Sequence, residues 1–136
     1  MKRRLSRECA FKALFMIDLG NNNDESALNY LLQDTGLSER ERSFCIKLVK
    51  GVLSKEKELD EILSRHLVNW QFDRLATAVR SILRLALYEM LYCDEIPPLV
   101  SINEAIELTK KYHDNDAARF VNGVLDKIRR IRADEV

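Results

Sequence analysis

The chain has few residues that interrupt a helix. Four glycines and two prolines occur among 136 residues, whereas apolar residues make up 46% and charged residues 32%. A strand-like alternation of apolar and polar residues does not persist anywhere in the sequence. This composition, rich in residues that favour helices, predicts a single all-α domain large enough to bury its own core.

Cysteine and histidine are also scarce. Cys9, Cys45 and Cys93 lie far apart and are odd in number, no C-x-x-C pair exists, and the only histidines are His66 and His113. This spacing argues against a zinc site and against a disulfide framework. We expect buried free thiols, no metal and no cofactor.

The chain lacks net charge and long apolar runs. Its 22 basic and 22 acidic residues cancel, so any contact with nucleic acid has to come from a local patch. No apolar run approaches the roughly 18 residues of a membrane span. Glu8, Lys12 and Asp18 interrupt the start, which therefore lacks the apolar core of a signal peptide. We expect a cytoplasmic protein.

Apolar residues recur at helical spacing along most of the chain. The pattern predicts six helices, at about 5–19, 24–33, 39–67, 74–93, 101–112 and 114–132. Ser38 with Glu41, and Ser101 with Glu104, have the spacing of capping boxes. Asp24 and Asp73 are expected caps, and Gly51 is a possible bend. Three helices on each side of Trp70 predict two three-helix sub-bundles, about 1–68 and 69–136, that share a core.

Motifs of catalysis are missing. The sequence has no glycine-rich phosphate loop, no dinucleotide fingerprint and no nucleophile motif. Glu104 and Glu107 lie three residues apart, a spacing more typical of a solvated helix face than of an acid–base pair, and the same applies to Glu89. His113 and Asp114 read as turn and cap residues. We predict that the protein is not an enzyme.

Basic residues concentrate at the N-terminus. Lys2, Arg3, Arg4 and Arg7 place four cations within seven residues. Cations at a helix N-terminus oppose the helix dipole and cost a few tenths of a kcal/mol, which indicates a purpose other than helix stability. A site for phosphate groups is one interpretation, and a solubilising tail is the other.

The last predicted helix carries an aromatic ring beside cations. Phe120 lies at the edge of the apolar arc, on a flank that also has Arg119, Gly123, Lys127 and Arg130. Cations with a displayed ring can bind a phosphate backbone and stack on an unpaired base. We predict one RNA site that requires the first and last helices to be neighbours, built from Arg3, Arg4, Arg7, Phe120 and Lys127. The alternative is that Phe120 is peripheral core.

The fourth predicted helix offers a candidate partner surface. Arg80, Arg84 and Tyr88 stand opposite its core stripe. Arg and Tyr are enriched in protein interfaces. This face therefore predicts a protein partner, unless it packs within the second sub-bundle.

Three segments in a fixed order resemble the NusB family of bacterial transcription antitermination factors. They are RRLSRECA with ALF at 3–10 and 13–15, LRLALYE at 83–89, and INEAIEL with FVNGVLDK at 102–108 and 120–127. The resemblance covers essentially the whole chain, although residues 20–70 add little to it. It implies an all-helical fold of two subdomains and no catalytic activity.

The resemblance also implies partners. Family members form a complex with NusE, a ribosomal protein of the small subunit, and the pair binds the single-stranded boxA element of ribosomal RNA leader transcripts. RNA polymerase then keeps elongating, and rRNA processing benefits. The antitermination complex of RNA polymerase is the expected setting.

Matching positions carry the family's site residues over to this chain. Arg3, Arg4 and Arg7 match the basic RNA-contacting motif, Phe120 an aromatic at the RNA site, and Asp116 an acidic residue that tempers RNA affinity. The NusE surface should include Arg84 and Tyr88. Because Leu5 interrupts the arginine run, the affinity of the free protein for RNA is expected to be modest.

Two alternatives remain open. A related domain precedes certain rRNA cytosine methyltransferases, and an rRNA-targeting role would be shared, although no methyl-donor-binding domain follows before Val136. The other alternative is a helical adaptor that binds only protein. Direct RNA binding separates this adaptor from the other two.

Overall fold

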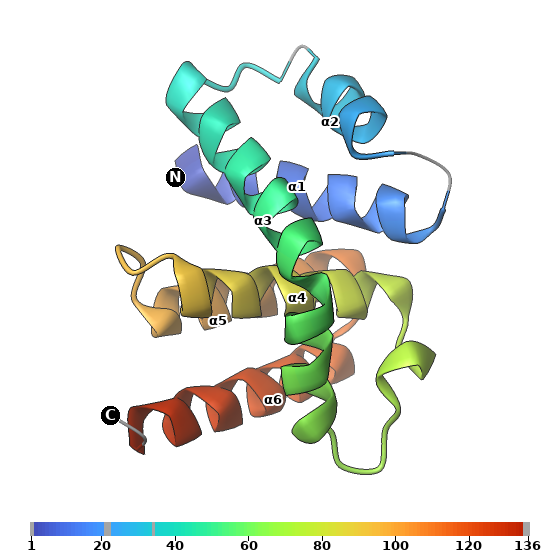
Figure 1. Ribbon diagram of the computed structural model, residues 1–136, viewed down its shortest axis with the longest axis vertical. Helices are drawn as coiled ribbons and strands as arrows, with labels where there is room; N and C mark the ends of the chain where they lie inside the picture. Colours follow the sequence, from blue (N-terminus) through green and yellow to red (C-terminus); the bar gives the residue numbers. More distant parts are fainter. Residues whose placement is uncertain (1, 21–22, 34, 135–136) are drawn as a thin grey trace.

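The protein is all-helical, as the sequence predicts. A computed structural model describes residues 2–20, 23–33 and 35–134. Within these residues the chain forms six α-helices and one short 3₁₀ helix, η1 (Figure 1). They are α1 Lys2–Asp18, α2 Asp24–Leu32, α3 Glu39–Arg65, η1 Phe72–Arg74, α4 Thr77–Tyr92, α5 Pro98–Tyr112 and α6 Asn115–Asp134.

Local capping residues fix several helix starts. The predicted box at α3 is present: the Ser38 side chain accepts a hydrogen bond from the Glu41 backbone, and the Glu41 side chain accepts one from the Ser38 backbone. Asp114 accepts a hydrogen bond from the N–H of Ala117 at the start of α6. The cap of α2 is Asn23 rather than the predicted Asp24, which is already helical.

Two predicted helix starts are wrong. α4 begins at Thr77, because the residues before it form η1, and Asp73 does not cap it. α5 begins at Pro98, where a missing N–H costs nothing in the first turn. Ser101 and Glu104 therefore lie inside α5 and are not a capping box.

α4 is the central helix of the molecule. It packs against α1 and α3 on one side and against α5 and α6 on the other. One hydrophobic core spans both halves of the chain, with Leu48, Leu83, Ile102 and Leu125 almost fully buried. The shared core agrees with the sequence analysis, whereas the division into two sub-bundles stays a prediction.

Gly51 allows α3 to approach α4 closely. A Cβ atom at this position would overlap the ring of Tyr88, which is buried. The glycine is therefore required for packing against α4, and this explains it better than the bend that the sequence suggested. Tyr88 in turn lies next to Tyr92, with 5.2 Å between the ring centroids.

Candidate nucleic-acid interface

Arg7, one of the predicted RNA contacts, lies in the interior. Its Nε donates to both carboxylate oxygens of Glu89 on α4, at 3.0 and 2.9 Å, and the two side chains are 6% and 2% exposed. The Ser101 hydroxyl donates to the same carboxylate at 3.0 Å. A buried charge needs such partners. The arrangement favours a role for Arg7 in positioning α1, and the interpretation of Glu89 as a solvated residue is wrong.

Arg4 lies at the surface and pairs with α5. Its Nε and Nη2 donate to the two carboxylate oxygens of Glu104 at 3.0 and 2.7 Å. The hydrogen bond from Arg4 lowers the pKa of Glu104, and the same bond raises the pKa of Arg4. The Glu104 side chain is only 14% exposed, so it does not belong to a solvated face either.

Arg3 turns toward α3. Its guanidinium carbon lies 4.1 Å from the centroid of the Phe44 ring, a distance typical of a cation–π contact. Arg3 remains exposed. The three arginines at the start of α1 thus contact three different helices. Arg3 contacts α3, Arg4 contacts α5 and Arg7 contacts α4. The side chain of Lys2, also a predicted contact, lies outside the described residues.

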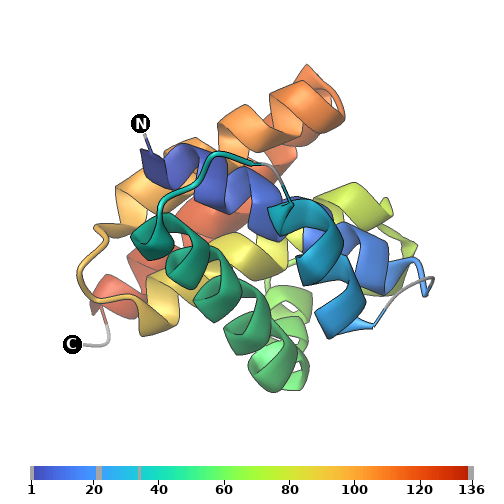
Figure 2. The same cartoon turned by 90° about the horizontal axis from the view of Figure 1, so that it is seen from above.

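A groove of about 440 Å³ runs between α1 and α5. Charged side chains of both signs line it, among them Arg4, Glu104, Glu107, Lys110 and Lys111. Lys111 pairs with Glu8 of α1 at 2.7 Å, and α1 crosses over α4 and α5 (Figure 2). The two lysines are not among the predicted contacts, although two adjacent cations in the last turn of a helix can be recognised in the sequence.

Phe120 lies in a second hollow, whose lining does not include Arg3, Arg4 or Arg7. The centroid of the Phe120 ring is 5.7 Å from the centroid of the Trp70 ring, and Trp70 is 57% exposed. The hollow, of about 260 Å³, also includes Arg74, His113 and Asp116. Asp116 and Phe120, both predicted site residues, therefore line the same hollow. Trp70 is not among the predicted contacts, although a tryptophan between two predicted helices can be recognised in the sequence.

The remaining predicted contacts lie along the exposed face of α6. Arg119 pairs with Asp116 at 3.3 Å, and both side chains are largely in solvent. Lys127 is also exposed. Both side chains are thus accessible to a ligand.

The predicted neighbourhood of the first and last helices is wrong. α1 packs against α2, α3 and α4, whereas α6 packs against α4 and α5, which lie between them (Figure 1). The candidate residues therefore form two clusters. α5 connects them, because it contributes Lys110 and Lys111 to the groove and leads directly into His113 beside Phe120.

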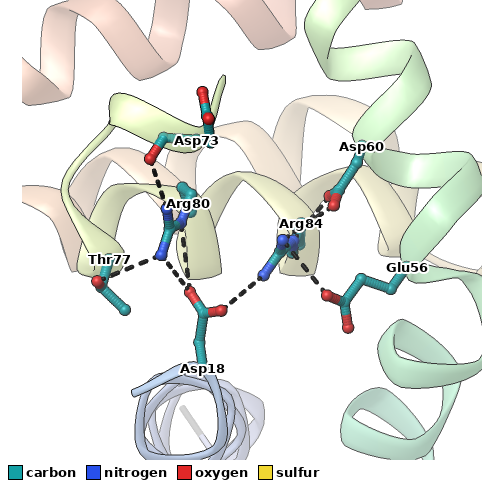
Figure 3. A network of polar contacts seen from close by, with 7 residues as sticks. All are labelled: Asp18, Glu56, Asp60, Asp73, Thr77, Arg80 and Arg84. Carbon is teal, nitrogen blue, oxygen red and sulfur yellow. Dashed lines mark hydrogen bonds and ion pairs between the residues drawn. The ribbon is translucent and has the colours of Figure 1, made fainter. Parts of the chain in front are cut away.

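The predicted partner residues Arg80 and Arg84 belong to an internal network at the other end of α1 (Figure 3). Asp18 lies between them, with its carboxylate 2.9 Å from Arg80 and 3.5 Å from Arg84. Arg84 also donates to Asp60 at 2.8 and 2.9 Å. Burial is the largest single influence on Arg84 and works against its charged form, but the pKa is raised because the Asp60 hydrogen bond and the charges of the surrounding carboxylates together outweigh it. The partner role of this surface stays a prediction.

Comparison with known proteins places the chain in a family. Residues 4–130 match the model of the NusB family, a span that includes Arg4, Arg7 and Phe120. The chain belongs to the NusB family. The transcription antitermination protein NusB of Bacillus velezensis is 50% identical over 129 residues, covering 95% of this chain and 96% of that protein.

Solved structures of NusB proteins share the fold. T. maritima NusB has a TM-score of 0.88 and 34% identity, covering 96% of this chain and 92% of the other. A crystal structure of antitermination factors NusB and NusE in complex with dsRNA has a TM-score of 0.88 and 29% identity, covering 96% and 97%. Both cover nearly the whole chain, so the fold is that of NusB.

Membership of the NusB family settles the function class. The family consists of transcription antitermination factors rather than enzymes, so this chain is an antitermination factor and the prediction that it has no catalytic activity is confirmed. In the part of the chain that the structure describes, no helix is long and apolar enough to cross a membrane.

Proposed function

We propose that this protein binds the boxA element of ribosomal RNA leader transcripts together with NusE, keeping RNA polymerase in elongation and supporting rRNA processing. The observation that carries the proposal is a path of cationic and aromatic side chains that follows α5 through two separate hollows. It begins at the exposed Arg4, follows the groove with Lys110 and Lys111, and reaches Phe120. Since nascent transcripts are made in the cytoplasm of a bacterium, this function places the protein there.

The solved relatives support this proposal. A NusB of the same fold has been crystallised with NusE and dsRNA. The similarity of fold extends over 96% of this chain. This similarity supports the proposal that a protein and an RNA bind this chain at the same time.

Each end of the path has its own chemistry. Arg3, Arg4, Lys110 and Lys111 would bind phosphates, which gives affinity without sequence preference. Phe120, Lys127 and the newly identified Trp70 would hold an unpaired base and its phosphate. Arg7 would position α1, and Asp116, beside Arg119, would temper the affinity for RNA.

The NusE surface is proposed around Arg80 and Arg84 of α4, next to Tyr88 of the same helix, which is buried against Gly51 of α3. Arginine side chains whose charges are already paired are well ordered, so binding them costs little further entropy. The pairing also means that a charge reversal at Arg84 would disturb the fold. Arg80 is the less enclosed of the two, with a side chain 19% exposed against 11% for Arg84, so Arg80→Ala is the milder variant for a test of partner binding.

A titration of labelled boxA RNA, with and without NusE and against a scrambled strand, tests the proposal. NusE should tighten boxA binding about tenfold or more, a coupling of ~1.4 kcal/mol, and boxA should tighten NusE binding by the same factor. With three or four phosphate contacts the log–log salt slope should be about −2 to −3. Equal affinities for boxA with and without NusE would contradict the cooperative mechanism.

A further inference from the structure

We propose that Glu104 competes with RNA phosphates for Arg4 and thereby sets the affinity of the N-terminal arginine cluster for RNA. The inference rests on the proposed RNA-binding function. Its basis is that Arg4, an exposed cation of this cluster, is already bound through two hydrogen bonds by a carboxylate from another helix.

The two partners differ in freedom to move. Glu104 projects from the middle of α5 and is 14% exposed, whereas Arg4 belongs to the first turns of α1 and its side chain is 60% exposed. A long exposed arginine side chain can change rotamer at little cost, but a carboxylate enclosed between two helices cannot leave. A ligand in the groove can therefore withdraw Arg4 while Glu104 stays in place.

Withdrawal of Arg4 does not leave Glu104 without a counter-charge. Nη1 of Arg7 lies 3.9 Å from the Glu104 carboxylate, while Nε of Arg7 remains bound to Glu89. An uncompensated buried charge would cost several kcal/mol, and the second arginine avoids that penalty. The Arg4–Glu104 pair is thus a contact that a phosphate can replace, whereas the Arg7–Glu89 pair is not.

Competition of this kind leaves a signature in the salt dependence. An arginine that binds a phosphate displaces counterions condensed on the RNA, but a carboxylate that stays beside the site offsets part of this displacement. Removing the carboxylate should raise affinity and make the log–log salt slope steeper by about 0.7, the value of one contact on a single strand. Because phosphate contacts carry no sequence information, boxA and scrambled RNA should gain by the same factor.

The test compares Glu104→Gln with Glu107→Gln in salt titrations of labelled boxA and scrambled RNA. Both variants remove one charge from the same groove and the same helix, but Glu107 makes no hydrogen bond to Arg4 among the described residues. We expect Glu104→Gln to tighten binding about threefold or more at low salt, with the steeper slope. Glu107→Gln should give a smaller gain and an unchanged slope.

Two further variants complete the design. In an Arg4→Ala background, Glu104→Gln should lose most of its effect, because the arginine for which Glu104 and phosphate compete has been removed. Glu104→Asp keeps a charge near Arg7 but shortens the reach to Arg4, so it should tighten binding partway even if the Gln variant folds poorly.

The outcomes separate this inference from the function on which it rests. If the wild type binds boxA and Glu104→Gln binds with the same affinity and slope, or gains no more than Glu107→Gln, the competition is disproved and RNA binding stands. If neither the wild type nor any variant binds boxA, with or without NusE, the proposed function fails and this inference fails with it.

Discussion

Two arginine networks connect α1 to the second half of the chain. In one of them α1 supplies the arginines, and in the other it supplies a carboxylate. At the start of α1, the arginines belong to α1 and the carboxylates to α4 and α5. At its end, the carboxylate of Asp18 belongs to α1 and the arginines belong to α4 (Figure 3). Both networks connect segments that are far apart in sequence.

The difference between them lies in charge balance. The first network pairs Arg4 with Glu104 and Arg7 with Glu89, and Arg3 lies beside it over the Phe44 ring. The second sets Arg80 and Arg84 against Asp18, Glu56 and Asp60. An excess cation remains at the first and an excess carboxylate at the second. An anionic ligand should therefore bind at the start of α1, although both networks contain arginines.

The largest expected effect comes from breaking the buried pair of the first network. Glu89→Ala leaves Arg7 charged and enclosed, which should cost about 3–5 kcal/mol of unfolding free energy. Urea denaturation measures this loss. Glu61→Ala on the exposed surface of α3 is the control and should stay within about 0.5 kcal/mol of wild type. Similar midpoints for the two variants would show that the buried pair does not hold α1.

A smaller but more specific effect is expected for the aromatic pair. Phe120→Ala should weaken boxA binding by about 1–3 kcal/mol if the ring stacks on a base. Since Phe120 is only partly buried, the fold should survive. RNA titration together with thermal unfolding measures both quantities. A loss of about 3–5 kcal/mol in stability would instead identify Phe120 as core.

Arg4 and Arg84 provide a direct comparison of the two networks. Arg4→Ala should change stability by less than about 1 kcal/mol, because an exposed ion pair contributes little, and it should weaken RNA binding. Arg84→Ala should destabilise by about 1–3 kcal/mol through its unpaired carboxylates and leave the RNA affinity of the folded protein nearly unchanged. If Arg84→Ala weakened RNA binding more than Arg4→Ala, the charge-balance argument would be wrong.

The smallest effect concerns acid. The Arg4 hydrogen bond lowers the pKa of Glu104 from 4.5, so this pairing stabilises the fold above about that pH and is lost as the pH falls further. The free energy of unfolding, measured by denaturation at several pH values and plotted as a curve against pH, should fall less steeply from pH 6 to 3 for Glu104→Gln than for the wild type. Parallel curves would show that Glu104 titrates alike in the folded and unfolded chains.

Features set by short stretches of sequence were predicted well. The apolar periodicity gave all six helices, and the capping residues Ser38 and Asp114 set two of their starts. The failure at α5 is instructive: Ser101 and Glu104 have the spacing of a capping box, yet Pro98 starts the helix earlier. Both side chains instead bind partners on other helices, Glu89 and Arg4.

By itself, the sequence determined the helical class, the family and the residue types of the proposed RNA site, because these depend on spacing within a few turns and on motifs. Only the tertiary structure decided which arginine is buried and which is exposed. Arg7 meets a carboxylate 82 positions away and Arg4 meets one 100 positions away. Arg4 and Arg7 lie only three positions apart in one helix. Which of them is buried depends on how the helices pack, and the local sequence pattern does not specify that packing.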